Sequence, residues 1–180
     1  MSTTAVNATE SPDIQRTRWR IDPKRSSVEF HVRNLWGLQT VKGRFERYDG
    51  ILDLTAQPSI ELTIEAESLN TSQVKRDEHL RSADFFDAAN HPQVRFVSQR
   101  ATLDGDRLDL QGELHAAGRS VPIELDGVIR PVGDELDVDV ETFADHRLLG
   151  MTWNRLGMLR APSKLLVRGR LVRDEKELIA

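Results

Sequence analysis

Residues 107–141 read RLDLQGELHAAGRSVPIELDGVIRPVGDELDVDVE, and this stretch decides the fold. In three runs an apolar residue or a glycine occupies every second position, and the positions between them are mostly charged or polar. Successive side chains on a strand point to opposite faces, so this period of two indicates strands that bury one face. The buried positions are Leu108, Leu110, Gly112 and Leu114, then Val121, Ile123, Leu125 and Gly127, then Leu136, Val138 and Val140.

Short turns join these runs, at Ala117-Gly118-Arg119 and at Gly133-Asp134. Glycine next to a small or charged residue is typical of tight hairpin connections. Similar alternation or strand-like composition is found in the ranges 28–32, 39–54, 60–66, 94–103 and 164–173. A meander of this kind either leaves two exposed edges or closes on itself, and closure removes the edges. We therefore predict a mainly β fold, an antiparallel β-barrel of about eight strands.

Alternation stops between residues 68 and 91, which read SLNTSQVKRDEHLRSADFFDAANH. A short helix over residues 73–82 fits the pattern there. Its apolar face is thin, because Val74 and Leu80 do not form a continuous stripe. We interpret this segment as a surface cap that Phe85 and Phe86 hold against the barrel.

Composition limits both the architecture and the partners. The chain has 180 residues, a net charge of −4 and no cysteine. We predict a loose tail over residues 1–16 and a single barrel domain over residues 17–176, because this length suits one core. The charge disfavours nucleic acid as a partner, since phosphate binding relies on clustered Lys and Arg. No stretch has the apolar length of a membrane span or the pattern of a signal peptide, so we expect no stable membrane insertion and a cytoplasmic protein.

Four stretches of the sequence resemble the YceI-like family of lipocalin-like barrels, which bind polyisoprenoids and related long-chain lipids. These stretches are WRIDPKRSSVEFHVRNL at 19–35, VKGRFERYDG at 41–50, VKRDEHLRSADFFDAANHPQVRFVS at 74–98 and LQGELHAAGRSVPIEL at 110–125. The resemblance implies that the barrel interior binds, sequesters or transports a long-chain hydrophobic ligand: a polyisoprenoid, an isoprenoid quinone, or a fatty amide or acid. It also allows a homodimer. The residues contain no recognised catalytic motif, so we predict no enzyme activity and no cofactor.

The interior positions and the cap together give the expected ligand-binding residues. They are Phe30, Val32, Phe45, Leu62, Ile64, Arg76, Asp77, His79, Leu80, Phe85, Phe86, Phe96, Leu110, Leu114, Ile123, Met151 and Trp153. The last two lie in DHRLLGMTWNRLGMLRAPS at 145–163, where the chain departs from the pattern we expect of the family. We place that loop at one mouth of the barrel, where it can alter which ligand enters.

Several alternatives stay open from the residues alone. Arg76, Asp77, His79 and Arg81 can bind a polar or phosphorylated head group, or they can fasten the cap to the barrel rim. The phenylalanines can line a cavity, or they can fill the barrel, as in a solid protein with a structural or stress-related role. Asp77 and His79 can also act as base and acid in an enzyme that uses a hydrophobic substrate. The five histidines show no metal-binding spacing, so we predict no metal.

Overall fold

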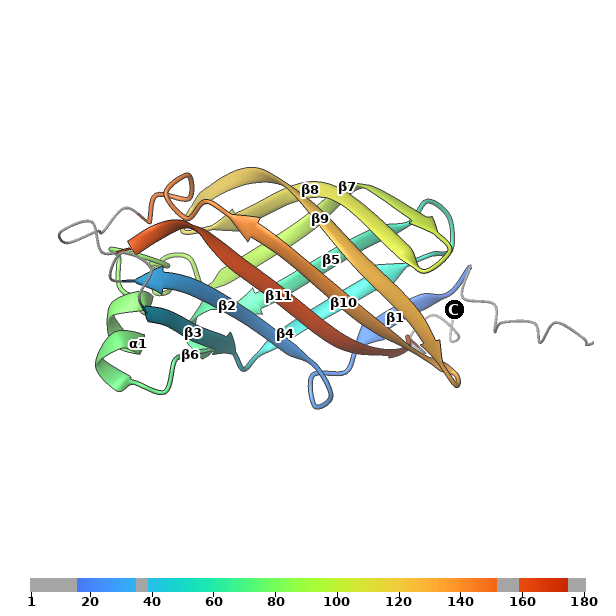
Figure 1. Ribbon diagram of the computed structural model, residues 1–180, viewed down its shortest axis with the longest axis horizontal. Coiled ribbons are helices and arrows are strands. Elements are labelled where there is room, and N and C mark those ends of the chain that lie inside the picture. Colours follow the sequence, from blue (N-terminus) through green and yellow to red (C-terminus); the bar gives the residue numbers. More distant parts are fainter. Residues whose placement is uncertain (1–15, 35–38, 152–158, 175–180) are drawn as a thin grey trace, which may run out of the picture.

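A computed structural model describes residues 16–34, 39–151 and 159–174 of the chain. Strands dominate it, and they alternate buried and exposed residues as the sequence predicts (Figure 1). The elements are β1 (Arg18–Ile21), β2 (Ser27–Asn34), β3 (Gln39–Phe45), β4 (Tyr48–Asp53), β5 (Ser59–Glu65), a turn of 3-10 helix (Ala66–Ser68), β6 (Leu69–Asn70), α1 (Val74–Arg81), β7 (Gln93–Asp104), β8 (Arg107–Ala116), β9 (Arg119–Val132), β10 (Glu135–Ala144) and β11 (Leu159–Arg173).

The strands form one closed antiparallel sheet. Strand β1 pairs with β4 on one side and with β11 on the other, and this second pairing closes the sheet. Six short strands together occupy three strand positions of the barrel, two strands to each position. In the first position, β1 and β2 pair with successive parts of β11. In the second, β4 pairs with β1 and β3 pairs with β2, and in the third, β5 pairs with β4 and β6 pairs with β3. With β7 to β11 this gives the eight-stranded antiparallel β-barrel that the sequence predicts.

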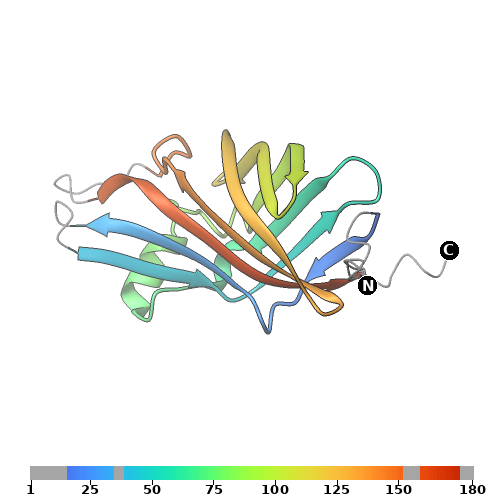
Figure 2. The same ribbon diagram turned by 45° about the vertical axis from the view of Figure 1, so that its right-hand side comes forward.

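One end of the barrel is closed by fully buried side chains. Leu108 and Leu136 are 0% exposed and Trp19 is 1% exposed. Trp19 pairs in register with Leu52 on β4, and Leu136 pairs in register with Leu171 on β11. This closed end contains β1 and the β9–β10 turn, at the right of Figures 1 and 2. Trp19, Leu108 and Leu136 are almost completely shielded from solvent at this end.

The opposite end carries the cap. Helix α1 matches the short helix that the sequence predicts, and it lies beside β3 and β6 at the left of Figures 1 and 2. The short turns after His146 lie at the same end, before β11 begins. We call this end the mouth.

Candidate functional site

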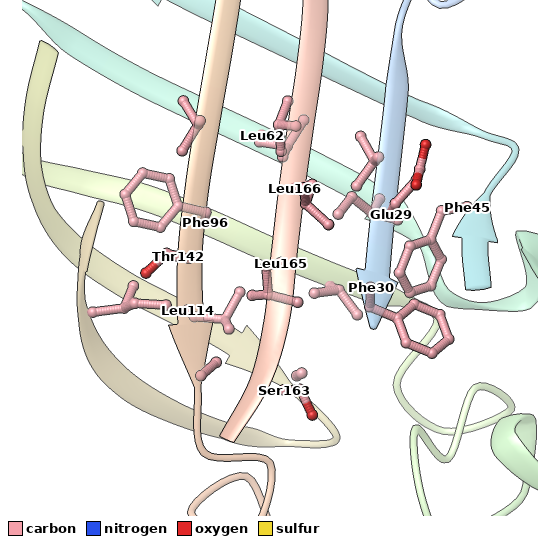
Figure 3. A pocket seen from close by; sticks show the side chains of 18 of the residues that line it. Glu29, Phe30, Phe45, Leu62, Phe96, Leu114, Thr142, Ser163, Leu165 and Leu166 are labelled. Carbon is pink, nitrogen blue, oxygen red and sulfur yellow. The ribbon is translucent and has the colours of Figure 1, made fainter. Parts of the chain in front are cut away.

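An apolar cavity of about 450 Å³ runs inside the barrel from Ser163 near the mouth to Ile21 and Leu171 near the closed end. This volume lies within the range of about 300–1,000 Å³ that is typical of small-molecule sites. Its wall is almost entirely apolar. Figure 3 shows that the lining side chains come from several strands around the barrel. The protein therefore has the shape and the surface chemistry to enclose an apolar molecule.

The structure brings nearly all the predicted ligand-binding residues to this cavity. Those that line it are Phe30, Val32, Phe45, Leu62, Ile64, Arg76, His79, Leu80, Phe85, Phe86, Phe96, Leu110, Leu114, Ile123 and Met151. Trp153 lies outside the described residues. Asp77 is not among the residues that line the cavity.

Sequence reasoning missed a second group of lining residues on the same inner faces. Val140 on β10 and Val167 on β11 are examples, and they are register partners on adjacent strands. They follow the same alternation as the predicted residues, so the signal was available. His146 and Ser163 also line the cavity. They lie in the mouth segment, where no periodicity marks their direction.

Two phenylalanine rings lie flat on the wall because glycine occupies the position beneath each ring. Phe30 pairs in register with Gly43, and a Cβ atom added at Gly43 would lie 2.2 Å from Cζ of Phe30. A Cβ added at Gly112 would lie 2.9 Å from the ring of Phe96. Real side chains do not approach this closely, so a larger residue at Gly43 must push the Phe30 ring away from the wall. At Gly112 the added atom would also lie 2.3 Å from the carbonyl oxygen of Val97, so the backbone of β7 would have to move together with the Phe96 ring. The two glycines thereby keep the rings out of the centre of the barrel.

Aromatic contacts attach the cap to the barrel wall. The ring of Phe45 on β3 is 5.6 Å from that of Phe30 and 5.7 Å from that of Phe86, the latter in an edge-to-face arrangement. On the cap itself, His79 meets Phe85 edge to face at 5.2 Å. Edge-to-face pairs of this kind add to the area that they bury. The predicted role of Phe85 and Phe86 in holding the cap agrees with these contacts.

The carboxylate of Asp77 fastens the cap instead of facing the cavity. Asp77 is 8% exposed. Its Oδ1 accepts hydrogen bonds from the backbone N–H of Thr71, at 2.9 Å, and from the Thr71 hydroxyl. Arg76 reinforces the same point, because its Nη2 donates to the Thr71 carbonyl at 2.8 Å, and Arg81 donates to the carbonyl of Leu69. Of the two alternatives left open for this cluster, these bonds support the structural one.

Replacing Asp77 with alanine should loosen the cap and lower the free energy of unfolding by about 1–3 kcal/mol, because the Thr71 N–H and hydroxyl lose their buried acceptor. Urea unfolding followed by circular dichroism measures this change. Lys75→Ala is the matched control, since Lys75 is an exposed residue on the same helix. An equal effect of the two substitutions would contradict the fastening role of Asp77.

A histidine and a serine form a polar pair on the cavity wall near the mouth. The Nδ1 atom of His146 lies 3.0 Å from Oγ of Ser163, at hydrogen-bond distance. Ser163 is buried on β11, and Figure 3 shows it close to the start of that strand. Burial lowers the pKa of His146 below its usual value, and the neighbouring Asp145 only partly opposes this effect. The imidazole is therefore neutral at pH 7.

The lowered pKa of His146 should make stability pH-dependent. In the unfolded chain this histidine has an ordinary pKa near 6.5, so below that pH the unfolded state binds more protons than the folded state. The contribution of His146 is then complete above about pH 6.5 and declines as the pH falls toward the lowered native pKa. Urea unfolding of wild type and His146→Gln should give a stability difference that shrinks between about pH 7.5 and about pH 5.5. Parallel pH profiles would contradict the burial of a neutral imidazole.

The part of the chain that the structure describes contains no group of three or more His, Cys, Asp or Glu side chains arranged to hold a metal ion. Within the same residues, no helix has the length and apolar character needed to cross a bilayer.

The barrel, its cap and its apolar cavity can now be compared with known proteins. The family described as YceI-like domain matches residues 19–175. The chain belongs to the YceI-like family. Protein YceI of Escherichia coli O157:H7 is 35% identical over 112 residues, which are 60% of this chain and 58% of that protein. The chain thus aligns with somewhat over half the length of this relative.

Solved structures share the YceI-like barrel at low sequence identity. BcnA of Burkholderia cenocepacia superposes with a TM-score of 0.77 at 16% identity, covering 83% of this chain and 98% of BcnA. A YceI protein of Campylobacter jejuni gives 0.65 at 23% identity, covering 77% of this chain and 88% of that one. A domain from Saccharophagus degradans described as polyisoprenoid-binding gives 0.72 at 15% identity, covering 87% and 98%. At such identities the likeness establishes the fold.

Proposed function

We propose that this YceI-like protein binds a long-chain hydrophobic molecule in its barrel and carries or sequesters it. The observation that supports this most strongly is the apolar cavity of about 450 Å³ with Phe30 and Phe96 held against its wall. Burying a methylene group contributes roughly 0.8 kcal/mol, so a chain of about a dozen carbons contributes roughly 10 kcal/mol before the cost of ordering it. A ligand of this kind needs few polar contacts.

Within this class we propose an isoprenoid chain, either a polyisoprenoid or an isoprenoid quinone, with a fatty amide or acid as the alternative. The description of the Saccharophagus degradans domain as polyisoprenoid-binding supports this choice. We further propose that the protein works in the cytoplasm, since a chain without cysteine suits a reducing compartment. A homodimer stays a prediction.

An enzyme that acts on a hydrophobic substrate is the alternative function, and the geometry gives it less support. A general base must reach the proton that it removes. The Asp77 carboxylate is buried and bonded to Thr71, and it does not face the cavity. His79 does face the cavity, but its Nε2 lies 3.5 Å from the Asp84 carboxylate on the cap. We therefore assign binding without turnover.

The test is to purify the protein under native conditions, extract it with organic solvent and analyse the extract by mass spectrometry. A long-chain isoprenoid or fatty compound in stoichiometric amount supports the proposal. Protein that yields no such compound, and that also fails to bind long-chain alcohols or hydrocarbons added afterwards, overturns it. Loss of the extracted compound in a variant with a filled cavity, described in the Discussion, ties the compound to the barrel interior.

A further inference from the structure

Polar residues are few along the cavity wall, and two of them belong to the outer face of the barrel. Glu29 and Glu61 occupy strand positions between inward-facing residues, and both are paired on the outside. Nε2 of His31 lies 3.4 Å from the Glu29 carboxylate, and Nη2 of Arg95 lies 2.6 Å from that of Glu61. Neither carboxylate is therefore positioned to receive a ligand.

The polar groups at the cap and on β10 are engaged as well. Nε of Arg76 donates to the Thr71 hydroxyl at 2.7 Å, in addition to its bond to the Thr71 carbonyl. Oγ1 of Thr142 donates to the carbonyl of Glu124 at 2.9 Å. These side chains contribute to the wall while their bonds are directed at the protein itself.

His146 and Ser163 are bonded to each other in a way that leaves capacity for a third group. Their 3.0 Å contact uses Nδ1 of the imidazole. No described residue forms a hydrogen bond with Nε2 of His146, and both residues line the cavity. The pair therefore presents one nitrogen and one hydroxyl to a molecule in the cavity.

The pair can either donate or accept a hydrogen bond. If Nδ1 carries the proton, Nδ1–H donates to the serine, Nε2 accepts, and the serine hydroxyl donates to a ligand. If Nε2 carries the proton, the serine donates to Nδ1 and Nε2–H donates to a ligand. An alcohol matches both arrangements, and a carbonyl oxygen accepts a donated hydrogen bond in either one. A carboxylate would bring a charge into an apolar wall whose described cation, Arg76, is bonded to Thr71.

We propose that His146 and Ser163 bind the polar end of the ligand and select a neutral oxygen group, an alcohol or a carbonyl, over a carboxylate. This inference rests on the proposed function and adds the head-group class to it. The lowered pKa of the half-buried imidazole supports the preference, because a protonated histidine would favour an anion. The apolar chain then lies between the pair and the closed end.

The experiment compares three probes with the same chain: dodecanol, dodecane and dodecanoate. Each displaces the fluorescent probe phenylnaphthylamine from wild type and from the variants Ser163→Ala and His146→Phe. Wild type should bind dodecanol about tenfold more tightly than dodecane or dodecanoate. Each variant should lose most of the dodecanol advantage and keep its affinity for dodecane, since the chain contacts are unchanged. A general structural defect would weaken both probes together.

Three matched variants complete the test. Thr102→Val removes a hydroxyl from the exposed face of β7, away from the cavity, and it should leave the dodecanol preference unchanged. Ser163→Thr and His146→Gln keep hydrogen-bonding groups and should retain part of the preference. If wild type binds dodecanoate more tightly than dodecanol, the inference is overturned but the proposed function stands. Loss of that tighter dodecanoate binding in Arg76→Gln would identify Arg76 as the group that binds the carboxylate. An unchanged preference in Ser163→Ala and His146→Phe also overturns it. Failure of all three probes to bind wild type overturns the proposed function itself.

Discussion

The double substitution Val140→Phe with Val167→Phe is expected to abolish the binding of long-chain ligands while the barrel still folds. These valines line the cavity and are register partners on β10 and β11, so two phenyl rings would extend into the same part of the cavity. The added rings gain apolar contacts that the valines lack, which offsets the strain of a larger side chain. Affinity for dodecanol should fall at least about tenfold, and the melting temperature should stay within a few degrees of wild type.

The control for this variant places the same change on the outside of the barrel. Val97 on β7 pairs with Glu61 and Glu113 and does not line the cavity. Val97→Phe should leave dodecanol binding unchanged. Displacement of phenylnaphthylamine measures affinity, and thermal unfolding by circular dichroism checks the fold. A filled variant that binds as wild type does would place the ligand outside the barrel and refute the proposed site.

The second large effect is on stability, and it should differ sharply between the two ends of the barrel. Leu136→Ala should lower the free energy of unfolding by about 2–5 kcal/mol, because Leu136 is fully buried in the packed closed end and its loss leaves a new void. Leu165→Ala at the cavity wall should cost roughly half as much or less, since the leucine already borders open space on one side.

Urea unfolding of both leucine variants under the same conditions measures this contrast. Ligand binding should respond in the opposite order: Leu165→Ala alters the cavity wall, whereas Leu136→Ala lies away from it. Equal losses of stability would mean that the mouth half is packed as densely as the closed end. That result would favour the solid barrel considered as an alternative from the sequence.

The fold was predictable from the sequence because alternation reports directly which side of a strand is buried. The eight-stranded barrel and the lining residues on its strands follow from that signal, whereas the short helix over residues 73–82 was placed where the alternation stops. The split of residues 39–54 into β3 and β4 did not follow, since it depends on a tertiary contact. There the N–H groups of Glu46 and Arg47 bond to the hydroxyl of Ser68, which is distant in sequence.

The state of the interior could not be predicted, because alternation does not say whether inward side chains meet. Phe30 fits either a filled or a hollow barrel until its ring is seen to lie on Gly43. The two roles left open for Asp77 could not be separated for a related reason, since its partner Thr71 precedes the helix and sequence spacing gives no sign of that bond. The contact between His146 and Ser163 spans a segment without periodicity, so it too required coordinates.

Gly43 and Gly112 give the barrel a way to change capacity without changing any residue that touches the ligand. An alanine at Gly43 would tilt the Phe30 ring inward, and an alanine at Gly112 would displace the Phe96 ring together with the β7 backbone at the Val97 carbonyl. Each displaced ring would then shorten the chain that fits. Members of a family built on this barrel could therefore diverge in ligand length through single substitutions at positions that have no side chain. In an engineered series, substitutions at these two positions would each change the length of the ligand that fits, and head-group recognition at the mouth would stay the same.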